Sequence, residues 1–164
     1  MTTIPLVIML GHQLCESLLI EARAALIDRD WPYAFDRLLQ FKGRIVCHMR
    51  AEEELLYPQY LLLMEPEIDV VRKLHGEHET VDSLTQEALD AARIFCPSRC
   101  NNALTTLIEL IPGHVMEEQR LACSLPRDNQ NGLLRKLALA LSARSADTTT
   151  TPVVLNQPVS HTYH

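Results

Sequence analysis

The sequence predicts an all-α protein: an antiparallel up-down four-helix bundle with a short extra C-terminal helix and a tail. Three observations support this fold class. Leu and Ala are abundant among the 164 residues, whereas only 5 are glycine and 3 are phenylalanine, a composition that favours helix over sheet. Four long stretches repeat apolar residues at helical spacing. The joins between these stretches are short, and short joins make consecutive helices antiparallel neighbours.

The first predicted helix covers about residues 3–28, with Pro5 in its first turn. The second begins within the segment DRDWP, where Asp30 or Trp31 is a candidate cap and Pro32 suits the first turn of a helix. Pro58 ends or kinks this second helix, because proline lacks the backbone N–H that the helix interior needs.

The third predicted helix begins at EPEID. Pro66 is near the start of this helix, and acidic residues lie at the positive end of its dipole. It runs to about residue 95. The fourth helix follows Ser98, a candidate cap, and ends before Pro126. These four helices form a predicted domain of residues 1–126.

The rest of the chain divides into a helix and a tail. The turn RDNQNG and the segment LLRKLALALSAR predict a short helix over residues 127–144, packed on the bundle or on a second chain. A homodimer through this helix and the tail is therefore one candidate assembly. Residues 145–164 are rich in Thr, Pro and Ser and are predicted to form a polar tail.

Composition also bears on partners and location. The net charge of −6 lacks the basic patch of a general nucleic-acid binder. No apolar run is expected to approach the length of a membrane span, and the start MTTIPLVIMLGH has no basic n-region of a signal peptide. Five cysteines without a CxxC motif fit a reducing compartment. We therefore expect a cytoplasmic protein without nucleic-acid or membrane partners.

Three polar residues of the first half of the bundle recur in the second half, each 66 positions later. The pairs are His12 and His78, His48 and His114, and Glu52 and Glu118. Residues four apart on a helix are about 40° apart around its axis, so the His and Glu of each His-x-x-x-Glu motif face the same way. They lie on the apolar stripes, so they are predicted to point into the bundle, and the flanking prolines place all four histidines at one level.

Six buried polar groups in one layer would be unfavourable if they were dry and unpaired. Metal ions resolve this: each could take two imidazoles, with the two glutamates bridging, which gives a dinuclear site. Taken alone, the segment HMRAEEELLYP favours an acidic helix face with a core histidine. The second copy and the matched lone histidines shift the interpretation to a metal site. Glu53 and Glu54 turn off the stripe and are expected on the surface, while Glu117 breaks the repeat that Glu118 completes.

These residues resemble those of the hemerythrin-like, or HHE cation-binding, domains. The matching segments are His12, HMRAEEELLYP from His48, His78 within HGEHE, and HVMEEQRLACSLP from His114. The resemblance covers about residues 1–126. It implies a four-helix bundle that holds two iron ions in a non-haem centre with an oxygen-derived bridge. It also implies that the four histidines are nitrogen ligands and that Glu52 and Glu118 are the bridging carboxylates.

The chain departs from the oxygen-carrying members that it resembles. Those proteins have a fifth histidine where this chain has Leu74. His75 is a candidate substitute, because it lies three residues before His78 and about 60° from it around the helix. They also have an aspartate where this chain has Gln119. The pattern is similar to the four-histidine, two-glutamate variant associated with iron sensing and iron–sulfur repair.

The leading hypothesis is a di-iron module that binds or senses O2, NO or iron rather than an enzyme. Spacing alone does not fix the metal, since imidazole suits several transition metals. Two alternatives stay open: a di-iron oxidoreductase or iron donor in nitrosative or oxidative stress repair, and a helical interaction module without metal. An apolar wall is expected beside the metals, with a coordination position left open to a diatomic ligand. Its expected members are Ile8, Met9, Leu74, Leu107 and Ile111.

Overall fold

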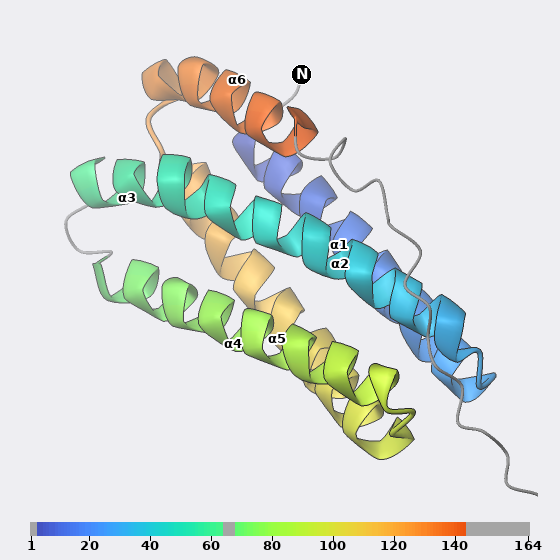
Figure 1. Ribbon diagram of the computed structural model, residues 1–164. Coiled ribbons are helices and arrows are strands. Elements are labelled where there is room, and N and C mark those ends of the chain that lie inside the picture. The colour runs from blue at the N-terminus through green and yellow to red at the C-terminus, as the bar shows by residue number, and fades with distance from the viewer. Residues whose placement is uncertain (1–2, 64–67, 144–164) are drawn as a thin grey trace, which may run out of the picture.

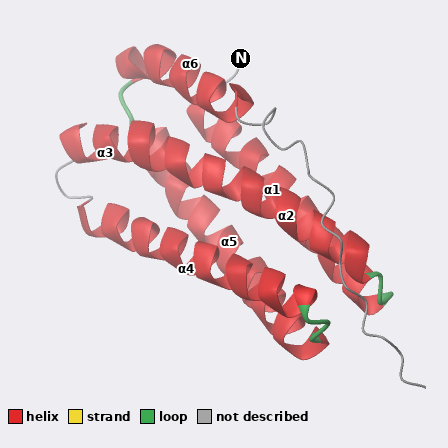
Figure 2. Cartoon of the chain, in the orientation of Figure 1, coloured by secondary structure: helices red, strands yellow, loops and turns green. Residues whose placement is uncertain are grey.

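The computed structural model describes residues 3–63 and 68–143, and all the elements within these ranges are helices (Figures 1 and 2). The elements are α1 (Ile4–Ile27), α2 (Trp31–Ala51), the π-helical turn η1 (Glu52–Leu56), α3 (Tyr57–Leu63), α4 (Ile68–Arg93), α5 (Pro97–Ser124) and α6 (Arg127–Ala143). The described residues contain no strand, which confirms the all-α class. Predictions for Pro66 and for residues 144–164 lie outside the described residues.

The long helices form a helical bundle. Helices α1 and α2 pack together, α4 and α5 pack together, and α1 also contacts α5 while α2 contacts α4 (Figure 1). Each of the four therefore has two neighbours around a shared core. The apolar stripes predicted from the sequence supply this core, because each helix turns one face inwards.

The turns after α1 and α4 have the same construction. Arg29 (φ 60°) and Phe95 (φ 55°) both adopt the left-handed conformation. The next residue in each turn then donates its N–H to a carbonyl five residues back, Asp30 to Ala25 at 2.8 Å and Cys96 to Ala91 at 2.9 Å. This pattern is a common helix stop. Arg29 and Phe95 are also 66 positions apart, so the repeat seen in the histidines extends to the turns.

Capping residues set where the next helices start. Asp30 caps α2, and its Oδ1 accepts a hydrogen bond from the Tyr33 N–H at 3.1 Å. Helix α5 begins at Pro97 with Cys96 as its N-cap. Ser98 therefore lies inside the first turn, and the prediction that it caps the helix is wrong. Pro97 determines this start, because a proline N at the first helical position has no N–H to satisfy.

Pro58 does not end the second helix. The chain continues as a helix through η1 and α3 as far as Leu63 (Figure 1). The disturbance that proline introduces is found just upstream, where the Tyr57 N–H donates to the carbonyl of Glu52 and closes a wider π turn. A π turn contains one residue more than an α turn. It therefore rotates every later side chain relative to an uninterrupted α-helix.

The core consists of two apolar clusters separated by a polar layer. One cluster lies towards the turns after α1 and α4 and includes Leu19, Phe41 and Leu104. The other lies at the opposite end and includes Leu74 and residues of α6. Along every long helix, the buried histidine lies between residues of the first cluster and residues of the second. The layer therefore crosses the whole bundle.

Helix α6 packs on the bundle through Leu133 and Leu137, which are buried in the second cluster. It contacts α1, α2 and η1 (Figure 1). Of the two placements predicted for this helix, the one on its own bundle is thus observed. The homodimer through this helix stays a prediction.

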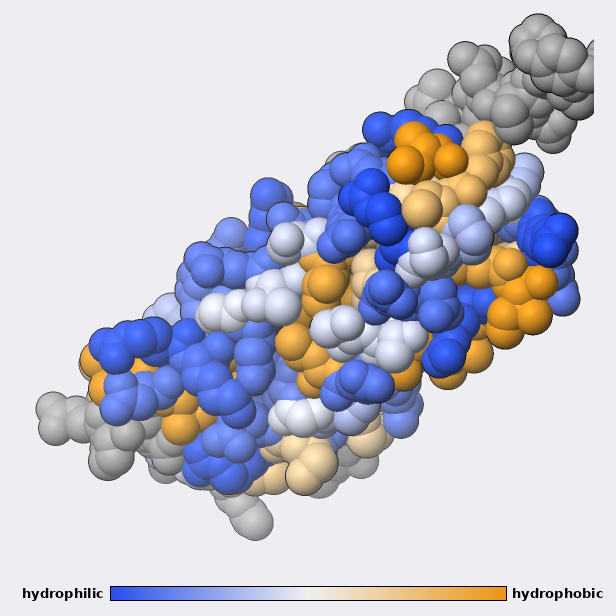
Figure 3. Space-filling model, turned by 90° about the horizontal axis from the view of Figure 1, so that it is seen from below, coloured by the Kyte–Doolittle hydropathy of each residue, from blue (hydrophilic) through white to orange (hydrophobic). Residues whose placement is uncertain are grey.

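Helix α1 is long and apolar enough to cross a membrane by length and composition. The expectation that no apolar run approaches this length is wrong for α1. One third of its most apolar window is buried, and core helices and signal sequences meet the same criterion. Its inner face supplies His12 and eight other buried residues. The face of the molecule seen in Figure 3 is mainly hydrophilic, with small apolar patches.

Candidate metal centre

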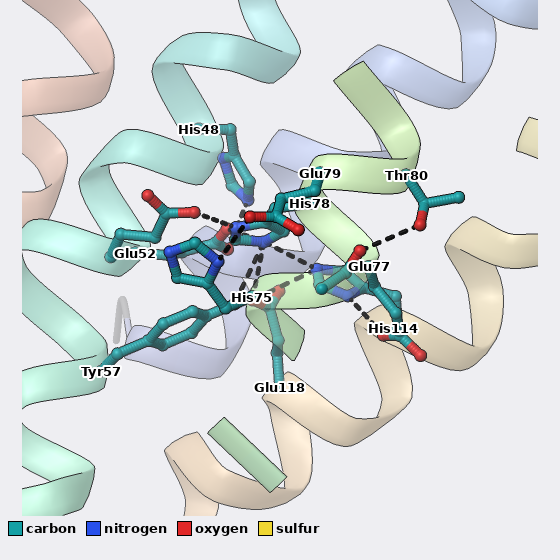
Figure 4. Close-up of polar contacts among 12 residues, drawn as sticks. His48, Glu52, Tyr57, His75, Glu77, His78, Glu79, Thr80, His114 and Glu118 are labelled. Atoms are coloured by element: carbon teal, nitrogen blue, oxygen red, sulfur yellow. Dashed lines mark hydrogen bonds and ion pairs between the residues drawn. The ribbon is translucent and has the colours of Figure 1, made fainter. Parts of the chain in front are cut away.

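All six residues predicted as ligands lie in the polar layer, and each is at most 3% exposed. His12 comes from α1, His48 from α2, Glu52 from the first position of η1, His78 from α4, and His114 and Glu118 from α5. The close-up in Figure 4 shows imidazoles and carboxylates turned towards one another between these helices. The structure therefore brings both halves of the sequence repeat into one cluster.

Glu118 is the best-connected group of the cluster. Its Oε2 lies 3.0 Å from His12 Nε2, and its Oε1 lies 3.3 Å from His114 Nε2 and 3.8 Å from His78 Nε2. The hydroxyl of Tyr57 donates a hydrogen bond to the same Oε1 at 2.7 Å. Glu118 thus contacts side chains from both halves of the bundle, as a bridging carboxylate must.

Glu52 also lies at the centre of the cluster, but it is close to histidines without accepting hydrogen bonds from them. Its Oε1 lies 2.9 Å from His48 Nε2 and 3.6 Å from His12 Nε2, and its Oε2 lies 3.6 Å from His78 Nε2. Within the part of the chain that the structure describes, neither carboxylate oxygen has a hydrogen-bond partner, nor has His48 Nε2, although all three atoms are buried. Buried polar atoms without partners are rare in native proteins, so these three need an explanation.

A metal ion accounts for these orphaned atoms. Two ligands bound at about 2.1 Å and at right angles on one ion lie roughly 3 Å apart. The 2.9 Å between His48 Nε2 and Glu52 Oε1 matches that separation without forming a hydrogen bond. In addition, the candidate ligand atoms of four residues lie within 4.8 Å of one another. These residues are His12, Glu52, His114 and Glu118. The residues present therefore fit a metal.

The electrostatics of the layer also favour a cation. Burial opposes protonation of His12, but its contacts with Glu118 and Glu52 raise its pKa to about 10. Burial likewise opposes ionisation of Glu118, yet hydrogen bonds from His114, His12 and His78 hold the pKa of this carboxyl well below its usual range. The buried layer thus holds negative carboxylates that need positive charge, which protons or metal ions can supply.

Tyr57 belongs to the site although the sequence analysis did not identify it. Its ring is buried, and its hydroxyl oxygen lies 3.0 Å from His78 Nε2 as well as donating to Glu118 (Figure 4). Burial and the nearby carboxylates raise the pKa of Tyr57, so the phenol keeps its proton. The signal was the position of this tyrosine five residues after Glu52, which shares a face with Glu52 only across a π turn.

Glu53 is not a surface residue without a role, which corrects the prediction made for it. Its side chain is only 31% exposed, and its Oε1 lies 2.7 Å from His78 Nδ1. Glu77, which directly precedes His78, makes the corresponding contact with His114, with Oε2 at 2.9 Å from Nδ1. Glu54 is exposed, as predicted. The carboxylates of Glu53 and Glu77 therefore contact the outer edges of imidazoles whose Nε2 atoms face the cluster.

His75 lies outside the cluster. Its side chain is 55% exposed, and its nearest charged partner is Glu79 at 3.9 Å. Leu74 is fully buried in the second apolar cluster. Glu117 forms an ion pair with Arg120 at 2.8 Å, so Glu118 rather than Glu117 occupies the layer. In this structure, the fifth-histidine role considered for His75 has no geometric support.

The expected apolar wall is divided between the two sides of the layer. Ile8 and Leu74 belong to the second cluster, whereas Leu107 and Ile111 belong to the first. Met9 is only half-buried. The site is therefore enclosed by apolar residues above and below rather than by one continuous wall.

Gly11 makes room for His48. A Cβ atom at Gly11 would lie 2.3 Å from Cε1 and 2.5 Å from Nδ1 of the His48 ring, far inside van der Waals contact. The backbone of α1 thus passes directly beside this imidazole. Only glycine allows that approach, which the sequence did not reveal because a lone glycine within a helix carries no specific signal.

We therefore expect Gly11→Ala to weaken metal binding and to destabilise the fold by about 1–3 kcal/mol, the usual effect of overpacking. In a helix without such a clash, the same change stabilises by up to about 1 kcal/mol. Gly76→Ala in α4 is the matched control, because a Cβ there meets nothing within 4 Å. Thermal unfolding of both variants tests this: the free energy of unfolding should fall in Gly11→Ala and rise in Gly76→Ala. Equal stabilisation by both would contradict the close approach.

The fold and the cluster together define a class: a helical-bundle protein with a buried His/Glu site suited to metal. The hemerythrin HHE cation-binding domain matches residues 7–122, so the chain belongs to this family. The match spans the polar layer and both halves of the repeat. Comparisons with curated proteins and with solved structures gave no match.

Proposed function

We propose that the chain is an antiparallel up-down four-helix bundle that holds a non-haem di-iron centre and binds or senses O2, NO or iron. The observation that carries this proposal is the trio of buried, unpartnered ligand atoms: both oxygens of Glu52 and Nε2 of His48. Membership of the HHE family supports iron as the metal. Imidazole and carboxylate donors are compatible with that choice.

Two ions are proposed because the four imidazoles form two pairs. The Nε2 atoms of His78 and His114 lie 3.2 Å apart, and the rings of His12 and His48 have centroids 4.3 Å apart. Glu52 and Glu118 each contact histidines of both pairs. Each pair would hold one ion, and the two carboxylates would bridge them.

When bound at such a centre, reduced iron would donate electron density to a small diatomic ligand such as O2 or NO. The chain itself supplies the surroundings. The Tyr57 hydroxyl points into the layer and donates a hydrogen bond to Glu118, with 2.7 Å between its oxygen and Oε1 of that carboxylate. Ile8, Leu74 and Ile111 enclose the layer and exclude water, which slows the loss of protons and charge from the site.

Metal analysis and optical spectroscopy of the purified protein test this proposal. We expect about two iron ions per chain, near-ultraviolet charge-transfer bands, and paramagnetic signals that change when NO is added to the reduced protein. An iron-loaded protein that ignores NO would contradict diatomic binding. A protein that takes up no metal would sink the di-iron proposal and favour a helical interaction module instead.

A redox enzyme or an iron donor in stress repair is the alternative use of the same centre. Turnover with an added reductant and peroxide or NO distinguishes it from reversible binding. Cytoplasmic location, and the absence of nucleic-acid and membrane partners, remain predictions from the sequence.

A further inference from the structure

The outer edges of the four imidazoles differ between the two pairs. His78 Nδ1 has Glu53 at 2.7 Å, and His114 Nδ1 has Glu77 at 2.9 Å. By contrast, His12 Nδ1 is buried and has no hydrogen-bond partner. Both of these outer carboxylates therefore contact the pair from α4 and α5, and among residues 3–63 and 68–143 the pair from α1 and α2 has no equivalent.

The internal repeat shows why His48 lacks such a partner. Glu77 directly precedes His78, and its equivalent 66 positions earlier is Gly11, which directly precedes His12. In both halves this residue contacts the neighbouring histidine at its Nδ1 edge. Glu77 does so with a carboxylate, whereas Gly11 brings its bare backbone so close that no side chain fits. Equivalent positions of the repeat therefore have opposite effects on the two pairs.

We infer that the two metal positions are unequal, and that Glu53 and Glu77 are positioning residues which make the His78/His114 position the tighter one, filled first. This inference rests on the proposed dinuclear site. A carboxylate on Nδ1 fixes the tautomer of the imidazole so that Nε2 is free to bind a metal. It also holds the ring orientation and makes Nε2 a stronger donor. The His12/His48 position has neither advantage.

The carboxylates of Glu53 and Glu77 are more exposed to solvent than the imidazoles that they contact. Glu53 and His78 line a surface pocket of about 300 Å³ together with residues of α2 and α4. Glu77 is also partly exposed and has Lys73 at 3.5 Å. Both carboxylates therefore stay in contact with solvent. Their imidazole partners, by contrast, are at most 3% exposed.

Titration of the metal-free protein with Co²⁺, followed by its optical bands in competition with a chelator, tests the inference. We expect two unequal steps in the wild type. Glu53→Gln and Glu77→Gln should each weaken the first step by about 10–100-fold, the usual effect of losing such a partner. The second step should change by less than about threefold. Melting temperatures of the metal-free variants report whether the fold survives.

Matched controls lie beside each residue. Glu54→Gln is the neighbour of Glu53 and is exposed, and Glu79→Gln lies two residues from Glu77 with a side chain that is 77% exposed. Neither control should alter either step. A double variant, His12→Ala with His48→Ala, should retain one tight equivalent that Glu53→Gln weakens.

Equal affinities in the wild type would overturn the inference while leaving the di-iron proposal standing. So would Gln variants that weaken both steps alike. A wild-type protein that binds no Co²⁺ and no iron would remove both, and metal analysis separates these outcomes. If the double histidine variant does not fold, the single Gln variants in the intact site decide the question.

Discussion

Replacing His78 or His114 with alanine is expected to lower iron content by at least one ion per chain and to lower the melting temperature in the presence of iron. A metal that binds only the native state stabilises it by about 2.7 kcal/mol when its free concentration is 100 times the Kd. For a domain of this size, losing that contribution lowers the melting temperature by roughly 5–10 °C. The His78 variant also leaves Glu53 and Tyr57 without a shared partner.

His75→Ala is the matched control for this prediction. His75 is on the same helix three residues before His78, but its side chain is exposed and lies outside the cluster. Iron content and melting temperature should stay at wild-type values. A loss of iron in this variant as large as in His78→Ala would mean that His75 turns inwards and serves as a fifth histidine.

The second large effect distinguishes the two glutamates. Glu118→Gln should destabilise the protein with and without metal, by about 1–3 kcal/mol in the metal-free form, because Tyr57, His12 and His114 all lose a charged partner. Glu52→Gln should leave the metal-free stability within about 1 kcal/mol of wild type, since neither Glu52 oxygen accepts a hydrogen bond there. Both variants should lose the stabilisation that iron provides.

Calorimetry of each variant in the metal-free and the iron-loaded form measures both the stability of the fold and the stabilisation that iron provides. The informative quantity is the change in melting temperature on loading with iron. Should Glu52→Gln prove as harmful as Glu118→Gln in the metal-free protein, the contacts of Glu52 with His48 and His12 would be worth more than their geometry indicates. Retention of the full iron effect by either variant would remove that residue from the bridge.

The sequence predicted the helices and the six central residues because both follow from regular spacing. His12 and His78, like Glu52 and Glu118, repeat at a constant offset, and helical periodicity converts that offset into a shared direction. Burial of all six in one layer agrees with this reasoning. Their role as ligands is still a prediction, which the variants described above will test.

Residues around the layer escaped prediction because they depend on local departures from regularity or on contacts between distant helices. The phase of an uninterrupted α-helix predicts Glu53 on the surface, but this residue lies within the π turn and reaches His78 on α4. Gly11 matters only because α2 brings His48 against it. Neither the extra residue of a π turn nor the approach of two backbones leaves a periodic signal in one sequence.

The π turn also makes the two halves of the site unequal, although their histidines and glutamates repeat. The residue 66 positions after Tyr57 is Cys123, and it is exposed on α5, whereas Tyr57 is buried. The two halves therefore match at their histidines and glutamates but differ five residues after each glutamate. The one extra residue of the π turn places a hydroxyl beside His78 and Glu118, whereas the equivalent residue of the other half, Cys123, is exposed. A small molecule bound there would meet two chemically different ends, so its orientation is chosen by the chain and not by chance.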